Sequence, residues 1–183
     1  NDFINYRDNA VNIASKETVV KQMPRVKIPN YCFKNGGNLT FADVTELWGM
    51  KVPSFSCGAA YADLDNDGDL DLVVNNINQP AFVYKNEAQT LYNNHYLQFN
   101  LIGSGANTQG LGASIVVCNK GKVQLVEQNP ARGYLSAVSG ILQVGMGAAT
   151  QADSIIVTWN SGKTQQLYNQ PVNRRINLVE AEA

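Results

Sequence analysis

The chain has 183 residues, 44% of them hydrophobic, and a formal net charge of −1 at pH 7. Its length suits two small domains, and the hydrophobic content is enough for packed cores, which excludes a disordered chain. The basic residues are scattered along the sequence, so no nucleic-acid partner is expected. No apolar run approaches the roughly 18 residues that a membrane span needs, so no transmembrane segment is expected in this stretch.

The chain begins with Asn1 and shows no apolar leader near its start. We interpret it as a mature or excised part of a longer protein. Its three cysteines, Cys32, Cys57 and Cys118, are far apart and lack the spacing of metal ligands. We expect buried thiols that pack as small hydrophobic side chains, and one disulfide between two of them stays open as an alternative.

The first predicted element is a helix over Asn9–Met23, which ends where Pro24 interrupts its weak apolar face. After Pro29 the apolar residues alternate with polar ones. This alternation continues on both sides of the stretch Asn-Gly-Gly-Asn at residues 35–38, which predicts two strands joined as a β-hairpin. The N-terminal part therefore combines one short helix with strands.

Part of the hairpin sequence recurs once. The stretch YCFKN at residues 31–35 returns as FVYKN at residues 82–86, about 50 residues later, and two further strands are predicted between them, over Cys57–Ala62 and Leu70–Asn75. Four short strands in one period are typical of a β-propeller blade. Because one blade cannot bury both faces of its sheet, we expect the remainder of the propeller upstream of this chain.

From residue 93 onward the sequence changes to short, evenly spaced strands separated by Gly and Asn turns. This pattern favours a β-sandwich, and the polar segment Glu87–Asn94 is the predicted boundary between the two domains. The predicted strands are Tyr96–Ile102, Gly112–Cys118, Lys122–Gln128, Ile141–Met146, Ser154–Trp159, Lys163–Tyr168 and Arg174–Val179.

The most distinctive stretch is DLDNDGDLDL at residues 63–72, which holds five of the nine aspartates of the chain. At ~5 Å separation and an effective dielectric constant of ~20, each like-charged pair costs roughly 3 kcal/mol. A bound divalent cation would offset this repulsion. A set of ligands that consists of carboxylates and other oxygens suits Ca²⁺ better than zinc or copper.

The spacing of these aspartates matches the first half of an EF-hand loop, with Gly68 at the sixth position, where the chain turns sharply. The twelfth position is Val74 rather than Glu, and a strand is predicted there, so this is not an EF-hand. The predicted Ca²⁺ ligands are the side chains of Asp63, Asp65, Asp67 and Asp71 and the backbone carbonyl of Asp69.

These motifs resemble two known families. Residues 58–75, GAAYADLDNDGDLDLVVN, resemble the calcium loop of FG-GAP/VCBS repeats, and residues 31–45 resemble the outer strands of such a blade. The C-terminal part resembles the ASPIC/UnbV domain, which often follows these repeats in proteins such as cartilage acidic protein and its bacterial secreted relatives. The marks of this second resemblance are GLGAS at 110–114, GYLS at 133–136, VGMG at 144–147 and VTWNSG at 157–162.

The resemblance implies a mainly β fold with one short N-terminal helix. Residues 1–87 would be the C-terminal part of an FG-GAP/VCBS propeller, with a helical insertion at 9–23, blade strands over 30–86 and a DxDxDG calcium loop. Residues 93–183 would be an ASPIC/UnbV-like β-sandwich. The families also imply an extracellular or cell-envelope location.

Two classes of function stay open. The first is a non-catalytic, calcium-stabilised binding or adhesion module of a larger secreted or cell-surface protein, with an unidentified protein or glycan as its ligand. The alternative is an accessory region of a carbohydrate-active or other hydrolytic enzyme whose catalytic residues lie outside this stretch. The first is favoured, and no catalytic residue is assigned, because the sole histidine, His95, directly precedes a predicted strand and is expected to be structural or exposed.

Overall fold

The computed structural model of the chain describes residues 25–180. These residues form strands in four sheets and a single short helix, which confirms a mainly β fold. They divide into two compact units, one made of residues 25–55 with 77–79 and the other of residues 56–76 with 80–180. The predicted helix Asn9–Met23 lies outside the described residues.

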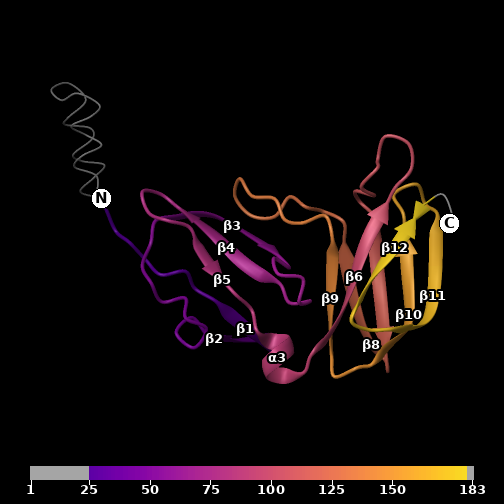
Figure 1. Ribbon diagram of the computed structural model, residues 1–183, viewed down its shortest axis with the longest axis horizontal. Coiled ribbons are helices and arrows are strands. Elements are labelled where there is room, and N and C mark those ends of the chain that lie inside the picture. The colour runs from indigo at the N-terminus through magenta and orange to yellow at the C-terminus, as the bar shows by residue number, and fades with distance from the viewer. Residues whose placement is uncertain (1–24, 181–183) are drawn as a thin grey trace. The chain divides into compact units, whose positions relative to one another are not determined.

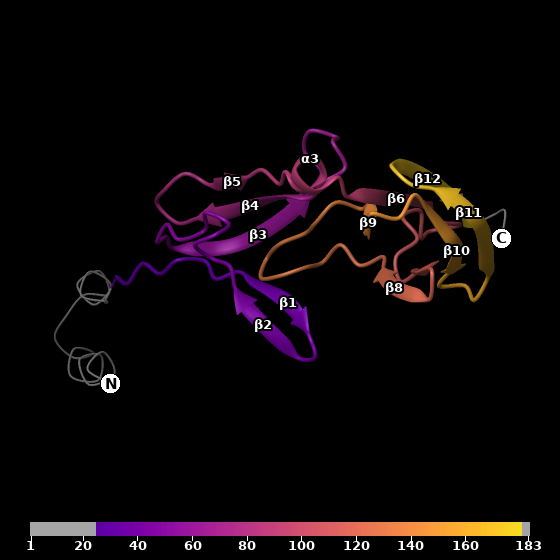
Figure 2. The same ribbon diagram turned by 90° about the horizontal axis from the view of Figure 1, so that it is seen from below.

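The first unit contains the predicted hairpin, drawn as two neighbouring strand arrows in Figure 2. Strand β1 (Phe33–Gly37) pairs antiparallel with β2 (Thr40–Asp43), which confirms the hairpin. At its tip Gly37 and Asn38 adopt positive φ angles of 80° and 50°, the conformation for which turns use Gly and Asn. The local Gly-Asn turn therefore sets the pairing of β1 with β2.

The second unit begins with a three-stranded antiparallel sheet in the order β3-β4-β5 (Figure 1). Its strands are β3 (Ser56–Ala62), β4 (Asp71–Asn76) and β5 (Phe82–Tyr84). The two copies of the repeated sequence fall in different sheets, because β1 pairs with its hairpin partner and β5 pairs with β4. Residues 25–180 therefore contain a hairpin and a three-stranded sheet, and no closed propeller.

The predicted boundary Glu87–Asn94 contains the short helix α3 (Ala88–Tyr92). The helix ends at Asn93, which has a left-handed φ of 51°, a common way for a helix to stop. Within residues 25–180 no helix has the length and apolar character that crossing a membrane requires.

The remainder of the second unit is a sandwich of two sheets, visible at the C-terminal end of the ribbon in Figure 1. One sheet has the order β11-β10-β7-β8 and is antiparallel throughout; in the other, β12-β6-β9, strand β12 runs parallel to β6. All seven predicted strands are confirmed, with small shifts at their ends. They are β6 (His95–Ile102), β7 (Ser114–Asn119), β8 (Lys122–Glu127), β9 (Leu142–Gly147), β10 (Gln151–Thr158), β11 (Thr164–Pro171) and β12 (Arg174–Val179).

Alternate side chains of these strands point between the two sheets and form one hydrophobic core. Leu97 and Phe99 are fully buried, as expected for apolar residues spaced two apart on a strand, and Trp159 is buried in the same core. The buried members of the core are Leu97, Phe99, Leu101, Ala113, Ile115, Val117, Val144, Met146, Ala152, Ile155, Val157, Trp159, Ile176 and Leu178.

We predict that residues 93–183 fold cooperatively when they are expressed alone. Every buried member of the core lies between Leu97 and Leu178, so removing residues 1–92 takes away none of it. The expected result is a single sigmoidal urea transition, followed by near-UV circular dichroism. A non-cooperative transition or a loss of near-UV signal would show that β3-β4-β5 belongs to the same folding unit, and that the predicted boundary does not separate two domains.

Candidate metal centre

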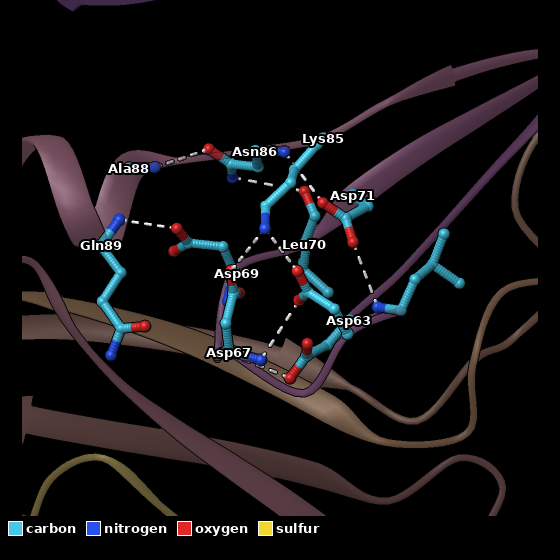
Figure 3. A network of polar contacts seen from close by, with 12 residues as sticks. Asp63, Asp67, Asp69, Leu70, Asp71, Lys85, Asn86, Ala88 and Gln89 are labelled. Atoms are coloured by element: carbon cyan, nitrogen blue, oxygen red, sulfur yellow. Dashed lines mark hydrogen bonds and ion pairs between the residues drawn. The ribbon is translucent and has the colours of Figure 1, made fainter.

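The acidic loop, residues 63–71, connects β3 to β4 in the second unit. The last residue of β3, Ala62, pairs with Asp71, the first residue of β4, so the loop returns on itself within a few ångströms of where it starts. Figure 3 shows its aspartates at close range. The apolar residues on either side belong to the sheet and hold the loop by its two ends.

Three of the five aspartates converge. Asp63, Asp65 and Asp67 each offer a carboxylate oxygen, and these oxygens all lie within 4.8 Å of one another. The loop backbone holds two of the carboxylates, because Asp65 Oδ1 accepts the Asp67 N–H at 3.3 Å and Asp67 Oδ1 accepts the Asp69 N–H at 2.9 Å. The alternation seen in the sequence thus becomes a cluster of oxygens on one side of the loop.

Within this cluster Asp63 carries an unused acceptor. Its Oδ2 atom accepts hydrogen bonds from the Gly68 N–H at 3.2 Å and from Gln98 Nε2 at 2.7 Å. Its Oδ1 atom is buried and accepts no hydrogen bond from any residue that the structure describes. A buried carboxylate oxygen without a partner is costly, and a cation is a partner that would remove this cost. The donor set therefore fits a hard cation such as Ca²⁺.

The structure places the carboxylates of the other two aspartates outside this cluster. Asp69 Oδ2 accepts the Gln89 N–H of α3 at 2.6 Å (Figure 3). Asp71 Oδ1 accepts the Asn86 N–H at 2.8 Å, and its Oδ2 accepts the Leu64 N–H at 3.2 Å. Neither carboxylate belongs to the group formed by the first three aspartates.

Asp69 is nearly buried and lies among other carboxylates. Burial raises the pKa of its carboxyl above the ordinary value, and the charges of Asp67, Asp63 and Asp71 act in the same direction, against the Gln89 N–H, which lowers it. Burial is the main cause of this shift, and the neighbouring carboxylates add to it.

One lysine supplies a counter-charge. The Nζ atom of Lys85 lies 2.6 Å from Asp65 Oδ2 and 3.8 Å from Asp67 Oδ2, and Figure 3 shows the amine reaching into the loop. This ion pair lowers the pKa of Asp65 and raises the pKa of Lys85. One ammonium cannot neutralise five carboxylates, and an exposed pair of this kind contributes little to stability. Asp63 Oδ1 has no hydrogen-bond partner among the described residues.

The turn of the loop depends on Gly68, as its position in the motif predicts. Its φ is 94°, and a Cβ atom at this residue would lie 1.9 Å from Cε1 of the Tyr96 ring on β6. The ring packs directly on the glycine. The Gly68 carbonyl accepts a hydrogen bond from Gln143 Nε2 at 2.6 Å. The loop therefore lies against the outer face of the sheet β12-β6-β9.

These contacts identify two functional candidates that the sequence analysis missed, Gln98 and Gln143. Both occupy polar positions of alternating strands, a pattern that predicts a solvent-exposed face, yet Gln98 is only 4% exposed. One signal in the sequence could have indicated their role. Each lies on the outer face of its strand between core residues, and these outward positions carry uncharged amides rather than charged side chains.

The structure also gives His95 a hydrogen-bond partner. His95 Nδ1 lies 2.8 Å from Asn173 Nδ2, and because an amide nitrogen can only donate, Nδ1 is the acceptor of this bond.

A cleft of about 420 Å³ in the second unit has Tyr61, Leu70 and residues of β8 and β9 in its wall. Its charged lining residues are Glu127 and Arg132. It therefore does not present the pair of carboxylates that glycoside hydrolysis commonly uses.

Comparison with known proteins bears on the C-terminal part. Residues 103–183 match the model of the family described as ASPIC and UnbV. The match covers β7 to β12 and confirms the ASPIC/UnbV part of the resemblance. A search of curated proteins finds no match. The assignment of residues 31–75 to FG-GAP/VCBS repeats stays a prediction.

We predict that Gly68→Ala lowers the free energy of unfolding by about 2–3 kcal/mol. Two costs add up: the new methyl group would clash with the Tyr96 ring, and alanine is strained at the positive φ of this residue. Gly105→Ala is the matched control: its φ is 59° and its Cβ would meet no atom within 4 Å, so it isolates the backbone cost, about 1 kcal/mol. Urea unfolding of both variants measures the difference. Equal losses would show that the loop does not pack on Tyr96.

Proposed function

We propose that this chain is a calcium-stabilised, non-catalytic binding module of a larger secreted or cell-surface protein. Its acidic loop binds one Ca²⁺ ion, and its ASPIC/UnbV-like sandwich forms the domain that follows. The observation that carries the proposal is the cluster of Asp63, Asp65 and Asp67, in which Asp63 Oδ1 is buried and has no donor among the described residues.

The chemistry of the cluster favours calcium over other divalent cations. All its donors are oxygens, which excludes a preference for zinc or copper. Ca²⁺ accepts six to eight oxygen ligands in flexible geometry, whereas Mg²⁺ demands a near-ideal octahedron and retains its waters. The three clustered carboxylates and the Asp69 carbonyl can contribute to a large coordination sphere. The fifth predicted ligand, the Asp71 carboxylate, would join it while its oxygens also accept the Asn86 and Leu64 N–H groups. When bound, the ion supplies positive charge that neutralises the loop.

The role of the ion is structural in this proposal. The acidic loop joins β3 to β4 and also contacts α3 and β6, so neutralising its charge stabilises the connection between these elements. Extracellular modules hold Ca²⁺ with dissociation constants in the range of about 10⁻⁴ to 10⁻³ M, because the ion is plentiful outside cells. A site of this kind would stay loaded after secretion.

A binding role for the module agrees with the surface of its first unit. The hairpin and the residues next to it expose large apolar and aromatic side chains, which proteins use for contacts with partners. We propose that this surface contacts further propeller strands or a protein or glycan ligand. The exposed side chains are Tyr31, Phe33, Leu39, Phe41, Leu47 and Trp48.

Isothermal titration calorimetry of the chelator-treated chain with CaCl₂ tests the proposal. We predict one binding site and, at a Ca²⁺ concentration 100 times the dissociation constant, a gain of ~2.7 kcal/mol in the free energy of unfolding. Asp65→Asn should weaken binding at least tenfold, because it removes one of the three clustered carboxylates. MgCl₂ should bind much more weakly.

Asp153→Asn is the matched control. Asp153 is an aspartate of the sandwich that accepts the Lys120 N–H at 2.6 Å, and it lies outside the acidic loop. Its substitution should leave the dissociation constant unchanged within a factor of two. No heat of binding and no thermal shift with wild-type protein would contradict the proposal and leave the cluster as an acidic turn neutralised in part by Lys85.

A further inference from the structure

The outer face of the sheet β12-β6-β9 carries a row of three polar side chains. Arg175 on β12 and Gln143 on β9 are the direct cross-strand partners of Gln98 on β6. Residues in direct register project from the same face of a sheet, so the three side chains lie side by side. The residues before and after Gln98 point into the core, so the row points away from it.

Hydrogen bonds fix the orientation of the central amide. Gln98 Oε1 accepts from Arg175 Nε at 3.0 Å, and a guanidinium can only donate, so this atom must be the oxygen. The amide nitrogen then faces the acidic loop, where it donates to Asp63 Oδ2 at 2.7 Å and to Gln143 Oε1 at 3.1 Å. Every polar atom of this nearly buried side chain has a partner of the correct kind, so the amide has one orientation.

The second amide holds the turn of the loop. Because Gln143 Oε1 accepts from Gln98, its nitrogen is free to donate, and it bonds the Gly68 carbonyl at 2.6 Å. Gly68 directly follows Asp67, the third aspartate of the cluster. The bond to its carbonyl therefore fixes the backbone next to the Asp67 carboxylate. Arg175, Gln98 and Gln143 therefore form a chain of bonds that reaches the loop at two points.

The bond to Asp63 determines which of its oxygens is available. Gln98 and the Gly68 N–H both bond Oδ2, and Oδ1 is left buried without a donor from the described residues. Removing a residue that hydrogen-bonds a metal ligand commonly lowers the affinity for the metal tenfold or more. The sandwich thus presets the geometry of the loop.

We propose that Gln98 and Gln143, oriented by Arg175, are positioning residues of the cation site, so that the affinity of the acidic loop for Ca²⁺ depends on the sandwich domain. This inference rests on the proposed function. Gln143 and Arg175 lie in the segment that matches the ASPIC and UnbV family, and Gln98 lies just before it. The coupling is reciprocal: whatever the sandwich contributes to Ca²⁺ binding, bound Ca²⁺ contributes to the stability of β6 and β9.

Titration of the whole chain with CaCl₂, following the wild type and two variants, tests the inference. Gln98→Met and Gln143→Met keep the length of the side chain and remove its hydrogen bonds. Each should raise the dissociation constant for Ca²⁺ about tenfold. In the wild type, Ca²⁺ should also slow hydrogen exchange of the β6 and β9 amides, and this protection should be lost in Gln98→Met.

Gln128→Met is the matched control for a loss of stability alone. Gln128 is a buried amide of the same sandwich, 3% exposed, that donates to the Gln109 and Gly140 carbonyls at 3.1 and 3.0 Å and has no bond to the loop. Its substitution should destabilise the protein and leave the dissociation constant unchanged within a factor of two.

The possible outcomes separate this inference from the proposed function. If wild-type protein binds Ca²⁺ and both Gln98→Met and Gln143→Met bind it equally well, the positioning role is wrong and the calcium site stands. If Gln128→Met weakens binding as much as they do, the effect is general destabilisation, and the positioning role is again wrong. If the wild type does not bind Ca²⁺, the proposed function and this inference both fail.

Discussion

Electrostatic repulsion among the five aspartates of residues 63–71 constrains the acidic loop and every element that contacts it. The fold divides these carboxylates into two sets. Asp69 accepts an N–H group of α3, and Asp71 accepts N–H groups of the segment after β5 and of the loop itself. These bonds hold α3 and the segment after β5 against the loop. The second set is the cluster of Asp63, Asp65 and Asp67, whose charge Lys85 offsets only in part. A bound cation would neutralise the remainder.

The same loop connects two parts of the second unit that the sequence pattern treats as separate. Both of its ends join strands of the sheet β3-β4-β5, while Asp63 and Gly68 between them are bonded to amides of the sandwich. Compactness therefore groups residues 56–76 with 80–180, although the hydrophobic core of the sandwich lies wholly within the C-terminal part. The sandwich therefore has its own core and shares a polar interface with the sheet β3-β4-β5, and the acidic loop forms that interface.

The strands of the sandwich could be predicted because each alternates apolar and polar residues, as Leu97, Phe99 and Leu101 do on β6. The hairpin could be predicted from its Asn-Gly turn. The pairing of distant strands could not: nothing local indicates that β12 lies parallel to β6, or that the two copies of the repeat occupy different sheets. Pairing partners far apart in sequence depend on packing between faces, which periodicity does not encode.

The candidate site was predictable to a similar degree. The spacing of the aspartates and the position of Gly68 indicate the loop and its turn, because those depend on neighbouring residues. The use of the Asp69 carboxylate by α3 and the roles of Gln98 and Gln143 depend on contacts between residues far apart in the chain. A polar residue on the outer face of a strand indicates solvent unless another part of the protein covers that face, as the acidic loop covers Gln98.

The most direct test of the account is a crystal structure of the whole chain grown with CaCl₂, with anomalous diffraction used to locate the ion. The account predicts one anomalous peak at about 2.3–2.6 Å from Asp63 Oδ1 and from oxygens of Asp65 and Asp67, with Lys85 Nζ displaced from Asp65. Absence of a peak at saturating Ca²⁺, with Lys85 still bonded to Asp65 and Asp63 Oδ1 bonded to another protein group or a water, would contradict it.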